Sequence, residues 1–342
     1  MKTRGFLCLA AALAALCLLA GCASRSSGSE DFAPSGEERL VVYTSHKEEV
    51  WRPIVREFEE RTGIWVDVVT GGSNELLERI SWEAEAPAAD VMFGGGVESL
   101  ESYSAYFAPY VCRDADKIEP QYRSESGLWT PFSALPVVLV YNPKLVTNLS
   151  GWEDLLQIQF HGRIAFADPE ISASCYTGLL TMLCALDAPQ ETTLRSFAQN
   201  LNGRLLSGSG DILDSVANGT DWVGVTLEET AQKRIAAGEN LRMVYPVEGT
   251  SAVPDGCAVI RGAQHEENAK RFVDFVVSLD VQELLQGDAF CRRSVRSDVE
   301  PSASLPRLEK LALVEYNVQW ASEERQTLLN SFRAYLNGDE TP

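Results

Sequence analysis

Small and hydroxylated residues gather where an apolar run gives way to an amphipathic segment. They form five short stretches: Ser45–His46, Gly71–Gly72–Ser73, Gly94–Gly95–Gly96, Ser172–Ala173–Ser174 and Thr226–Glu229. A loop between a strand and a following helix presents unpaired backbone N–H groups and the positive end of the helix dipole. Glycine also lets the backbone approach a ligand closely. Each loop alone is explained as an ordinary turn. The first three together, expected on one edge of a sheet, predict a site for a small anion.

Side chains in or near these stretches add further hydrogen-bond donors and acceptors to the predicted site. Thr250 and Ser251 add hydroxyl donors, and His46 adds a hydrogen bond, or a charge when it is protonated. Glu228 and Glu229 are suited to accept from a sugar hydroxyl or to pair with an amine. Simpler roles stay open, in which His46 is exposed and the two glutamates only complement a helix N-terminus.

The elements that must position these groups alternate between strands and helices. β-rich runs at 39–44, 64–69 and 89–93 are each followed by apolar residues at helical spacing. Ser45, with Glu48 three residues on, predicts a capping box at the start of the first helix. The order is typical of a mostly parallel sheet covered by helices, in which ligands bind beyond the carboxyl ends of the strands.

Further elements are predicted in the second half of the chain. The strands are expected at 133–141, 163–167, 222–226 and 243–245, with one more in 250–260 that returns through a turn at Pro254–Asp255–Gly256. The helices are expected at 172–186, from Glu228, at 266–285 and at 308–336.

Composition and charge narrow the class of protein. The 342 residues predict about two domains. The 29 Lys and Arg against 49 Asp and Glu give a net charge of −20, which argues against binding to nucleic acid. The chain contains 3 His and neither a G-x-S-x-G nor an H-E-x-x-H motif. We therefore expect a binding protein and not an enzyme.

The first residues have the pattern of a lipoprotein signal peptide over 1–21. A basic start precedes an apolar run that ends in Ala20–Gly21–Cys22, where the Cys22 thiol would accept a lipid. An ordinary signal peptide with an incidental cysteine is the alternative. Residues 22–37, rich in Ser and Gly, predict a flexible tether. No later apolar run is long enough to span a membrane, so we expect a protein anchored outside the cytoplasm through lipidated Cys22.

The remaining cysteines do not indicate a clear framework of disulfide bonds. They are Cys112, Cys175, Cys184, Cys257 and Cys291. Their number is odd and no C-x-x-C pair occurs, so they predict no zinc site and are best explained as small buried hydrophobes. A single disulfide among them stays open outside the cytoplasm. The sequence predicts no cofactor and no resident metal.

Several segments, in their order and spacing, resemble type 2 periplasmic binding proteins. They are Val41–Glu48, Phe58–Ile64, Asp90–Gly96, Tyr141–Pro143, Ala167–Pro169 and Gly249–Gly256. The likeness covers about residues 39–300 and is to the branch of ferric-ion, thiamine and phosphorylated-solute binders of ABC importers. It implies an α/β fold of two lobes, with mixed sheets flanked by helices and a hinge of crossing strands, that closes on its ligand.

The resemblance also implies an organisation and partners. Lobe 1 would hold residues 38–132 and 250–300, and lobe 2 would hold 133–249 and 301–342. A membrane-anchored monomer would deliver a small anionic solute to permease and ATPase subunits. A ligand-sensing module for a receptor partner would have the same fold and stays open. Tyr176 is expected in the core or the cleft lining, and Arg292–Arg293 as a solvated or lobe-bridging pair.

The identity of the solute depends on how the sequence departs from the ferric branch. That branch places a His after the first strand, a Glu after the third and two adjacent Tyr in the second lobe. His46 fills the first place, but the second falls within Gly94–Gly96 and the third near Glu228–Thr230. Fe³⁺ needs phenolate and carboxylate oxygens, and most of these ligands are missing at the three places. We therefore expect a phosphate- or phosphonate-bearing solute. Ferric iron, with Glu228 and Glu229 as ligands, is the alternative.

Overall fold

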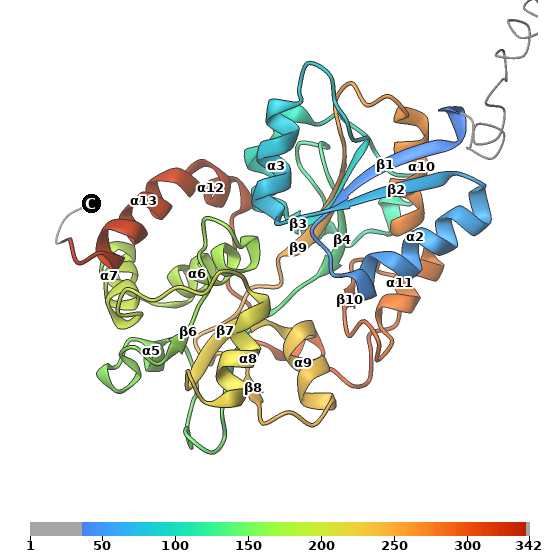
Figure 1. The fold of residues 1–342 in the computed structure, drawn as a ribbon. Coiled ribbons are helices and arrows are strands. Elements are labelled where there is room, and N and C mark those ends of the chain that lie inside the picture. Colours follow the sequence, from blue (N-terminus) through green and yellow to red (C-terminus); the bar gives the residue numbers. More distant parts are fainter. Residues whose placement is uncertain (1–35, 340–342) are drawn as a thin grey trace, which may run out of the picture. The chain divides into compact units, whose positions relative to one another are not determined.

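The computed structural model describes residues 36–339. The predicted signal peptide, Cys22 and the tether up to residue 35 lie outside the described residues. The chain from Glu38 onward forms one compact unit. It contains two sheets, each in its own half of the unit (Figure 1). Within residues 36–339 we find no helix with the length and hydrophobicity of a membrane span.

The larger sheet is the base of lobe 1. Among the described residues it has six strands in the order β10–β4–β9–β3–β1–β2. β1 pairs in parallel with β2 and β3, whereas β9 runs antiparallel between β3 and β4. The strands are β1 (Arg39–Thr44), β2 (Trp65–Thr70), β3 (Val91–Gly96), β4 (Thr130–Ala134), β9 (Pro254–Val259) and β10 (Arg293–Ser294).

Helices bury both faces of this sheet. α2 (Glu48–Thr62), α10 (Glu266–Val276) and α11 (Leu279–Leu285) pack with one face, and α3 (Ser73–Trp82) and α4 (Val97–Ser102) pack with the other. Val42 and Phe93 belong to the first core, whereas their neighbours Tyr43 and Met92 belong to the second. This alternation follows because successive side chains along a strand point to opposite faces.

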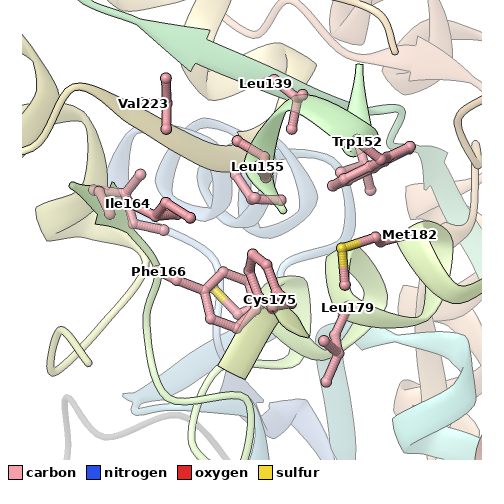
Figure 2. Close-up of a cluster of buried hydrophobic side chains, with 14 of the residues drawn as sticks. Leu139, Trp152, Leu155, Ile164, Phe166, Cys175, Leu179, Met182 and Val223 are labelled. Carbon is pink, nitrogen blue, oxygen red and sulfur yellow. The ribbon is translucent and has the colours of Figure 1, made fainter. Parts of the chain in front are cut away.

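The smaller sheet is the base of lobe 2, with strands in the order β6–β7–β5–β8. Figure 2 shows part of its core, in which Leu139 and Val223 from the sheet lie with Leu179 and Met182 from α6. The elements are β5 (Val137–Tyr141), α5 (Trp152–Leu155), β6 (Ile164–Ala165), α6 (Ala173–Ala185), α7 (Gln190–Asn200), α8 (Gly210–Asn218), β7 (Val223–Leu227), α9 (Glu228–Ala236) and β8 (Arg242–Val244).

The C-terminal segment touches both lobes. α12 (Val318–Glu323) packs against α4 of lobe 1, and α13 (Arg325–Leu336) packs against α7 of lobe 2. The assignment of residues 301–342 to lobe 2, like the other lobe boundaries, stays a prediction. The short 3₁₀ helices are η1 (Gly36–Glu38), η2 (Ser104–Tyr106), η3 (Ala115–Lys117), η4 (Pro120–Tyr122), η5 (Ile158–Phe160) and η6 (Leu308–Lys310).

Three predicted elements are interrupted. The strand expected at 133–141 is two strands in different sheets, β4 and β5, because Pro136 between them cannot donate to a ladder. The helix expected at 266–285 breaks before Ser278, whose backbone is extended at the start of α11. The tail at 308–336 is not one helix, because Val314 N–H donates to the Thr250 carbonyl and holds that stretch extended.

One predicted turn and one predicted helix cap were wrong. Pro254–Asp255–Gly256 lies inside β9 and forms no turn. α2 begins at Glu48, with Lys47 and not Ser45 at its N-cap and no side-chain cap within the described structure. The His46 ring packs edge-on against Phe93 at 4.4 Å, and this burial keeps the segment out of the helix. Gly94–Gly96 belongs to β3, where the pairing with β9 shifts register.

Candidate functional site

A cleft of about 430 Å³ lies between the lobes, where several strand–helix junctions meet. Lobe 1 contributes the ends of β1 and β3 and the start of α3, and lobe 2 contributes the starts of α6, α8 and α9. Ten residues that the sequence predicted as ligand-binding line it: Ser45, His46, Gly72, Ser73, Gly95, Gly96, Ser172, Ser174, Thr226 and Glu229.

The N-terminus of α6 forms part of the cleft lining. Ser172 caps this 13-residue helix, because its Oγ accepts the Cys175 N–H at 3.3 Å. The Ser172 and Ser174 hydroxyls lie 3.1 Å apart. The first turn of α6 contains no acidic residue. The positive end of its dipole is therefore not compensated from within the helix.

The other helix starts at the cleft carry their own carboxylates. Glu75 lies in the first turn of α3 and accepts the Gly72 N–H at 3.3 Å. Asp211 lies in the first turn of α8, and Glu228 and Glu229 in that of α9. Since a carboxylate there already interacts with the helix dipole, α6 is the junction best suited to receive an anion from outside.

The floor of the cleft in lobe 1 holds a buried charged cluster. Arg292 donates to Asp255 at 2.6 Å and to the Ser133 hydroxyl at 2.8 Å. His46 is 8% exposed, and its Nε2 lies 3.6 Å from the Asp255 carboxylate. Neither His46 Nε2 nor Arg292 Nε has a hydrogen-bond partner among residues 36–339, although both atoms are buried. Such groups are costly to leave unsatisfied.

The protonation states of this cluster follow from its burial. Burial, together with the nearby Arg292 charge, lowers the pKa of His46 well below its ordinary value, so the imidazole is neutral at pH 7. Burial alone would raise the pKa of Glu229, but Arg292 and Lys233 outweigh it and lower that pKa. Glu229 lies 3.1 Å from Lys233 and 3.5 Å from Arg292, so it links the lobes as an anion.

Four predicted residues lie away from the cleft for clear reasons. Tyr176 is fully buried and donates to the Ala321 carbonyl at 2.5 Å, so it ties α6 to α12 in the core. Thr250 donates to the Val137 carbonyl at 2.6 Å, and the Ser251 hydroxyl lies 2.6 Å from that of Thr181. Both hold the segments that cross between the lobes. A Cβ on Gly71 would stand 3.0 Å from Leu76 Cδ2, so Gly71 faces a core residue of α3.

Gly94 and Glu228, which were also predicted to bind the ligand, are not among the residues that line the cleft. Gly94 has φ +109°, and a Cβ there would stand 2.7 Å from Ser45 Oγ, so the residue permits close approach without reaching the cleft. Arg293 donates two 2.7 Å hydrogen bonds to the buried Glu228 carboxylate. Both arginines are buried, so the pair is not solvated. Of the two roles expected for it, its contacts with Glu228 and Glu229 of α9 fit the lobe-bridging one.

Sequence reasoning missed part of the lining. Ser207–Gly208–Ser209 precedes α8 and lines the cleft. Its composition is the signal that marked the other loops, so it could have been found. Arg292 and Asp255 could not, because tertiary packing alone brings them to His46. The remaining missed residues with charged or hydroxyl side chains are Lys47, Glu75, Thr177, Thr230 and Lys233.

In the described part of the chain, Cys112, Cys175, Cys184, Cys257 and Cys291 are all free thiols, and burial raises the pKa of each.

Comparison with known proteins adds a family and several relatives. The model of the family described as bacterial extracellular solute-binding protein matches residues 93–315. Iron uptake protein A1 of Synechocystis sp. is 28% identical over 292 residues, covering 78% of this chain and 79% of its own. A putative 2-aminoethylphosphonate-binding periplasmic protein of Salmonella typhimurium is 24% identical over 266 residues, which cover 72% of this chain and 74% of that protein.

A solved structure supports the fold independently. The periplasmic binding protein AfuA from Actinobacillus pleuropneumoniae, with fructose-6-phosphate bound, matches with a TM-score of 0.81 and 23% identity. The match covers 88% of this chain and 99% of that one. The predicted α/β fold, with two lobes of mixed sheet flanked by helices, is confirmed.

Proposed function

The chain belongs to the bacterial extracellular solute-binding proteins, and we propose that it captures a small solute bearing a phosphate or phosphonate group between its lobes. One observation carries the proposal. The N-terminus of α6, which has no acidic residue in its first turn, lines the same cleft as His46 and Arg292. The buried His46 Nε2 and Arg292 Nε atoms have no partner in the described residues. An anion with several oxygens would accept from backbone N–H groups of lobe 2 and from these two donors of lobe 1 at once.

The names of two relatives support this class of solute. One is a putative 2-aminoethylphosphonate-binding protein, and the other was solved with fructose-6-phosphate. Ferric iron is the second candidate, favoured by the name of the Synechocystis relative. The cleft lining contains no tyrosine among the described residues, and within 36–339 no three His, Cys, Asp or Glu gather as metal ligands. Oxygen-rich coordination of Fe³⁺ is therefore less well supported than anion binding.

The proposal includes delivery and not turnover. The protein would pass its solute as a monomer to the permease and ATPase subunits of an ABC importer. It would be held outside the cytoplasm by a lipid on Cys22. Replacing Cys22 by Ala should then leave the protein unlipidated, and the mass of the purified protein would report this.

A thermal-shift panel tests the class of solute. A ligand that binds the native state raises the melting temperature in proportion to the logarithm of its excess over Kd. We expect shifts with fructose 6-phosphate or 2-aminoethylphosphonate, and none with unphosphorylated fructose. A shift with ferric citrate alone would overturn the proposal in favour of iron.

A pair of glycine variants tests whether the solute binds in the cleft. A Cβ at Gly208 or at Gly210 meets nothing within 4 Å, so Val should be accommodated at both. Gly208 lines the cleft, whereas Gly210 does not. Gly208→Val should abolish the thermal shift and Gly210→Val should retain it. Equal shifts in the two variants would place the solute elsewhere.

A further inference from the structure

A buried carboxyl lies directly behind the cleft, at a contact between the lobes. Glu98, on α4 of lobe 1, is fully buried and is hydrogen-bonded to the hydroxyl of Thr177, on α6 of lobe 2. Thr177 and Gly96 line the cleft, and a Cβ on Gly96 would stand 2.7 Å from Glu98 Oε2. Separation of the lobes would therefore break this hydrogen bond and open the carboxyl to water.

The hydrogen bonds of Thr177 indicate which group carries the proton. Its Oγ1 contacts both Glu98 Oε1 and the Ala173 carbonyl, the latter at 3.0 Å. A hydroxyl has one proton to donate, and a carbonyl oxygen can only accept. Both contacts are satisfied together when Thr177 donates to Ala173 and accepts from Glu98. That arrangement requires a protonated carboxyl.

The surroundings of Glu98 do not supply a counter-charge in contact with it. Within residues 36–339 Glu98 forms no ion pair, and its Oε2 has no hydrogen-bond partner. The titratable groups that face it are Tyr176 of α6, Tyr316 of the C-terminal segment and Arg325 of α13. Arg325 favours the ionised carboxyl, but its guanidinium is stacked on the Tyr176 ring at 4.3 Å.

We propose that the lobes close with Glu98 protonated and open when it ionises, so that solute capture is coupled to uptake of one proton. The lobe motion belongs to the proposed function, on which this inference rests. Burial raises the pKa of Glu98 and outweighs the surrounding hydrogen bonds, that of Thr177 foremost, and the Arg325 charge, all of which favour the ionised carboxyl. In the open form a hydrated carboxyl would return to an ordinary pKa and be ionised at pH 7. A rise in pH would therefore favour the open form.

Small-angle X-ray scattering of the purified protein without any solute tests this directly. The radius of gyration should increase from pH 5 to pH 8 in the wild type. Glu98→Gln, which mimics the protonated carboxyl, should keep the smaller value at both pH values. Glu125→Gln is the matched control, since Glu125 is exposed, and it should behave as the wild type does.

A second variant keeps the test decisive if Glu98→Gln does not fold. Thr177→Val removes the acceptor of the Glu98 proton, so the opening transition should move to lower pH. A radius that is independent of pH in the wild type, or a transition unchanged by both Glu98→Gln and Thr177→Val, would overturn the proposal. Because no solute is present, this result is separate from the outcome of the thermal-shift panel.

Discussion

At the scale of single residues, we propose that the cleft binds its solute through unsatisfied hydrogen-bond donors and not through net charge. Lys47, Lys233 and Arg292 stand there with Glu75, Glu229 and Asp255, so the ionised groups balance. Several are already paired, as Arg292 is with Asp255. The donors without a partner in the described residues are the buried His46 Nε2 and Arg292 Nε.

The depressed pKa of His46 predicts an acid-sensitive contribution to stability. Below pH 6.5 the unfolded chain binds a proton at His46 that the folded chain does not, so the free energy of unfolding falls as the pH falls. The loss is at most about 1.4 kcal/mol for each pH unit below that value. In urea titrations at pH 7 and pH 5, His46→Gln should lose less stability on acidification than the wild type.

The control for this prediction is His161→Gln, at an exposed histidine. It should show the pH dependence of the wild type. Identical pH dependence in His46→Gln and the wild type would show that His46 titrates normally in the folded state.

The residues that could be predicted from the sequence are those whose role is local. Glycine and serine after a strand mark a junction wherever they occur, and most of those stretches do line the cleft. Arg292, Asp255 and Glu98 carry no such local signal. Their role comes from burial beside groups far away in the sequence, such as Ser133 and Thr177.

At the scale of elements, the start of α6 is held by a serine cap, and this cap can be tested apart from the proposed binding. Ser172→Ala removes an N-cap hydrogen bond and should lower the free energy of unfolding by about 1 kcal/mol. Ser209→Ala is the matched control, because Ser209 precedes α8 without a side-chain cap in the described structure. Chemical denaturation of both variants should separate them. Equal losses would mean that the Ser172 cap contributes nothing.

Gly178 shows how closely α6 packs on the sheet of lobe 2. In a helix interior, Gly→Ala is normally stabilising by about 1 kcal/mol. Here an added Cβ would stand 2.9 Å from Val225 Cγ1 on β7, and overpacking of this kind costs about 1–3 kcal/mol. We expect Gly178→Ala to lower the melting temperature in calorimetry. An increase would show that α6 can move away from β7 at little cost.

The sequence predicted the existence of most elements but not where they are interrupted. Strands and helices of both lobes were found because their apolar spacing is local. The breaks at Pro136 and Ser278 depend on which sheet or helix layer each half joins. The extended stretch before α12 likewise depends on its pairing with Thr250, from a distant part of the chain.

At the scale of the whole molecule, the lobes are joined by a buried ion pair. Arg293 of β10 and Glu228 of α9 are 6% and 1% exposed. Removing one partner leaves a buried charge uncompensated, which costs about 3–5 kcal/mol. Glu228→Gln should therefore lower the free energy of unfolding by several kcal/mol, and Glu228→Gln with Arg293→Met should recover much of the loss. Denaturation of the two single variants and the double variant measures this coupling. Additive losses would exclude it.

The two-lobed arrangement was predictable because the order of motifs along the chain resembles a known family. The cross-lobe contacts were not, since they join residues such as Glu98 and Thr177 that no local pattern connects. In our proposal, those contacts determine how the lobes close and how the cleft holds its solute.

We propose that a phosphate- or phosphonate-bearing solute binds in the cleft beside the α6 N-terminus. Calorimetric titration of the wild type and Gly208→Val with fructose 6-phosphate and with 2-aminoethylphosphonate tests it most directly. We predict one-to-one binding of at least one of them to the wild type. In the variant the affinity should be lower by a factor of about 100 or more, which corresponds to about 2.7 kcal/mol. Equal affinity in both proteins, or no binding of either compound to the wild type, would contradict this prediction.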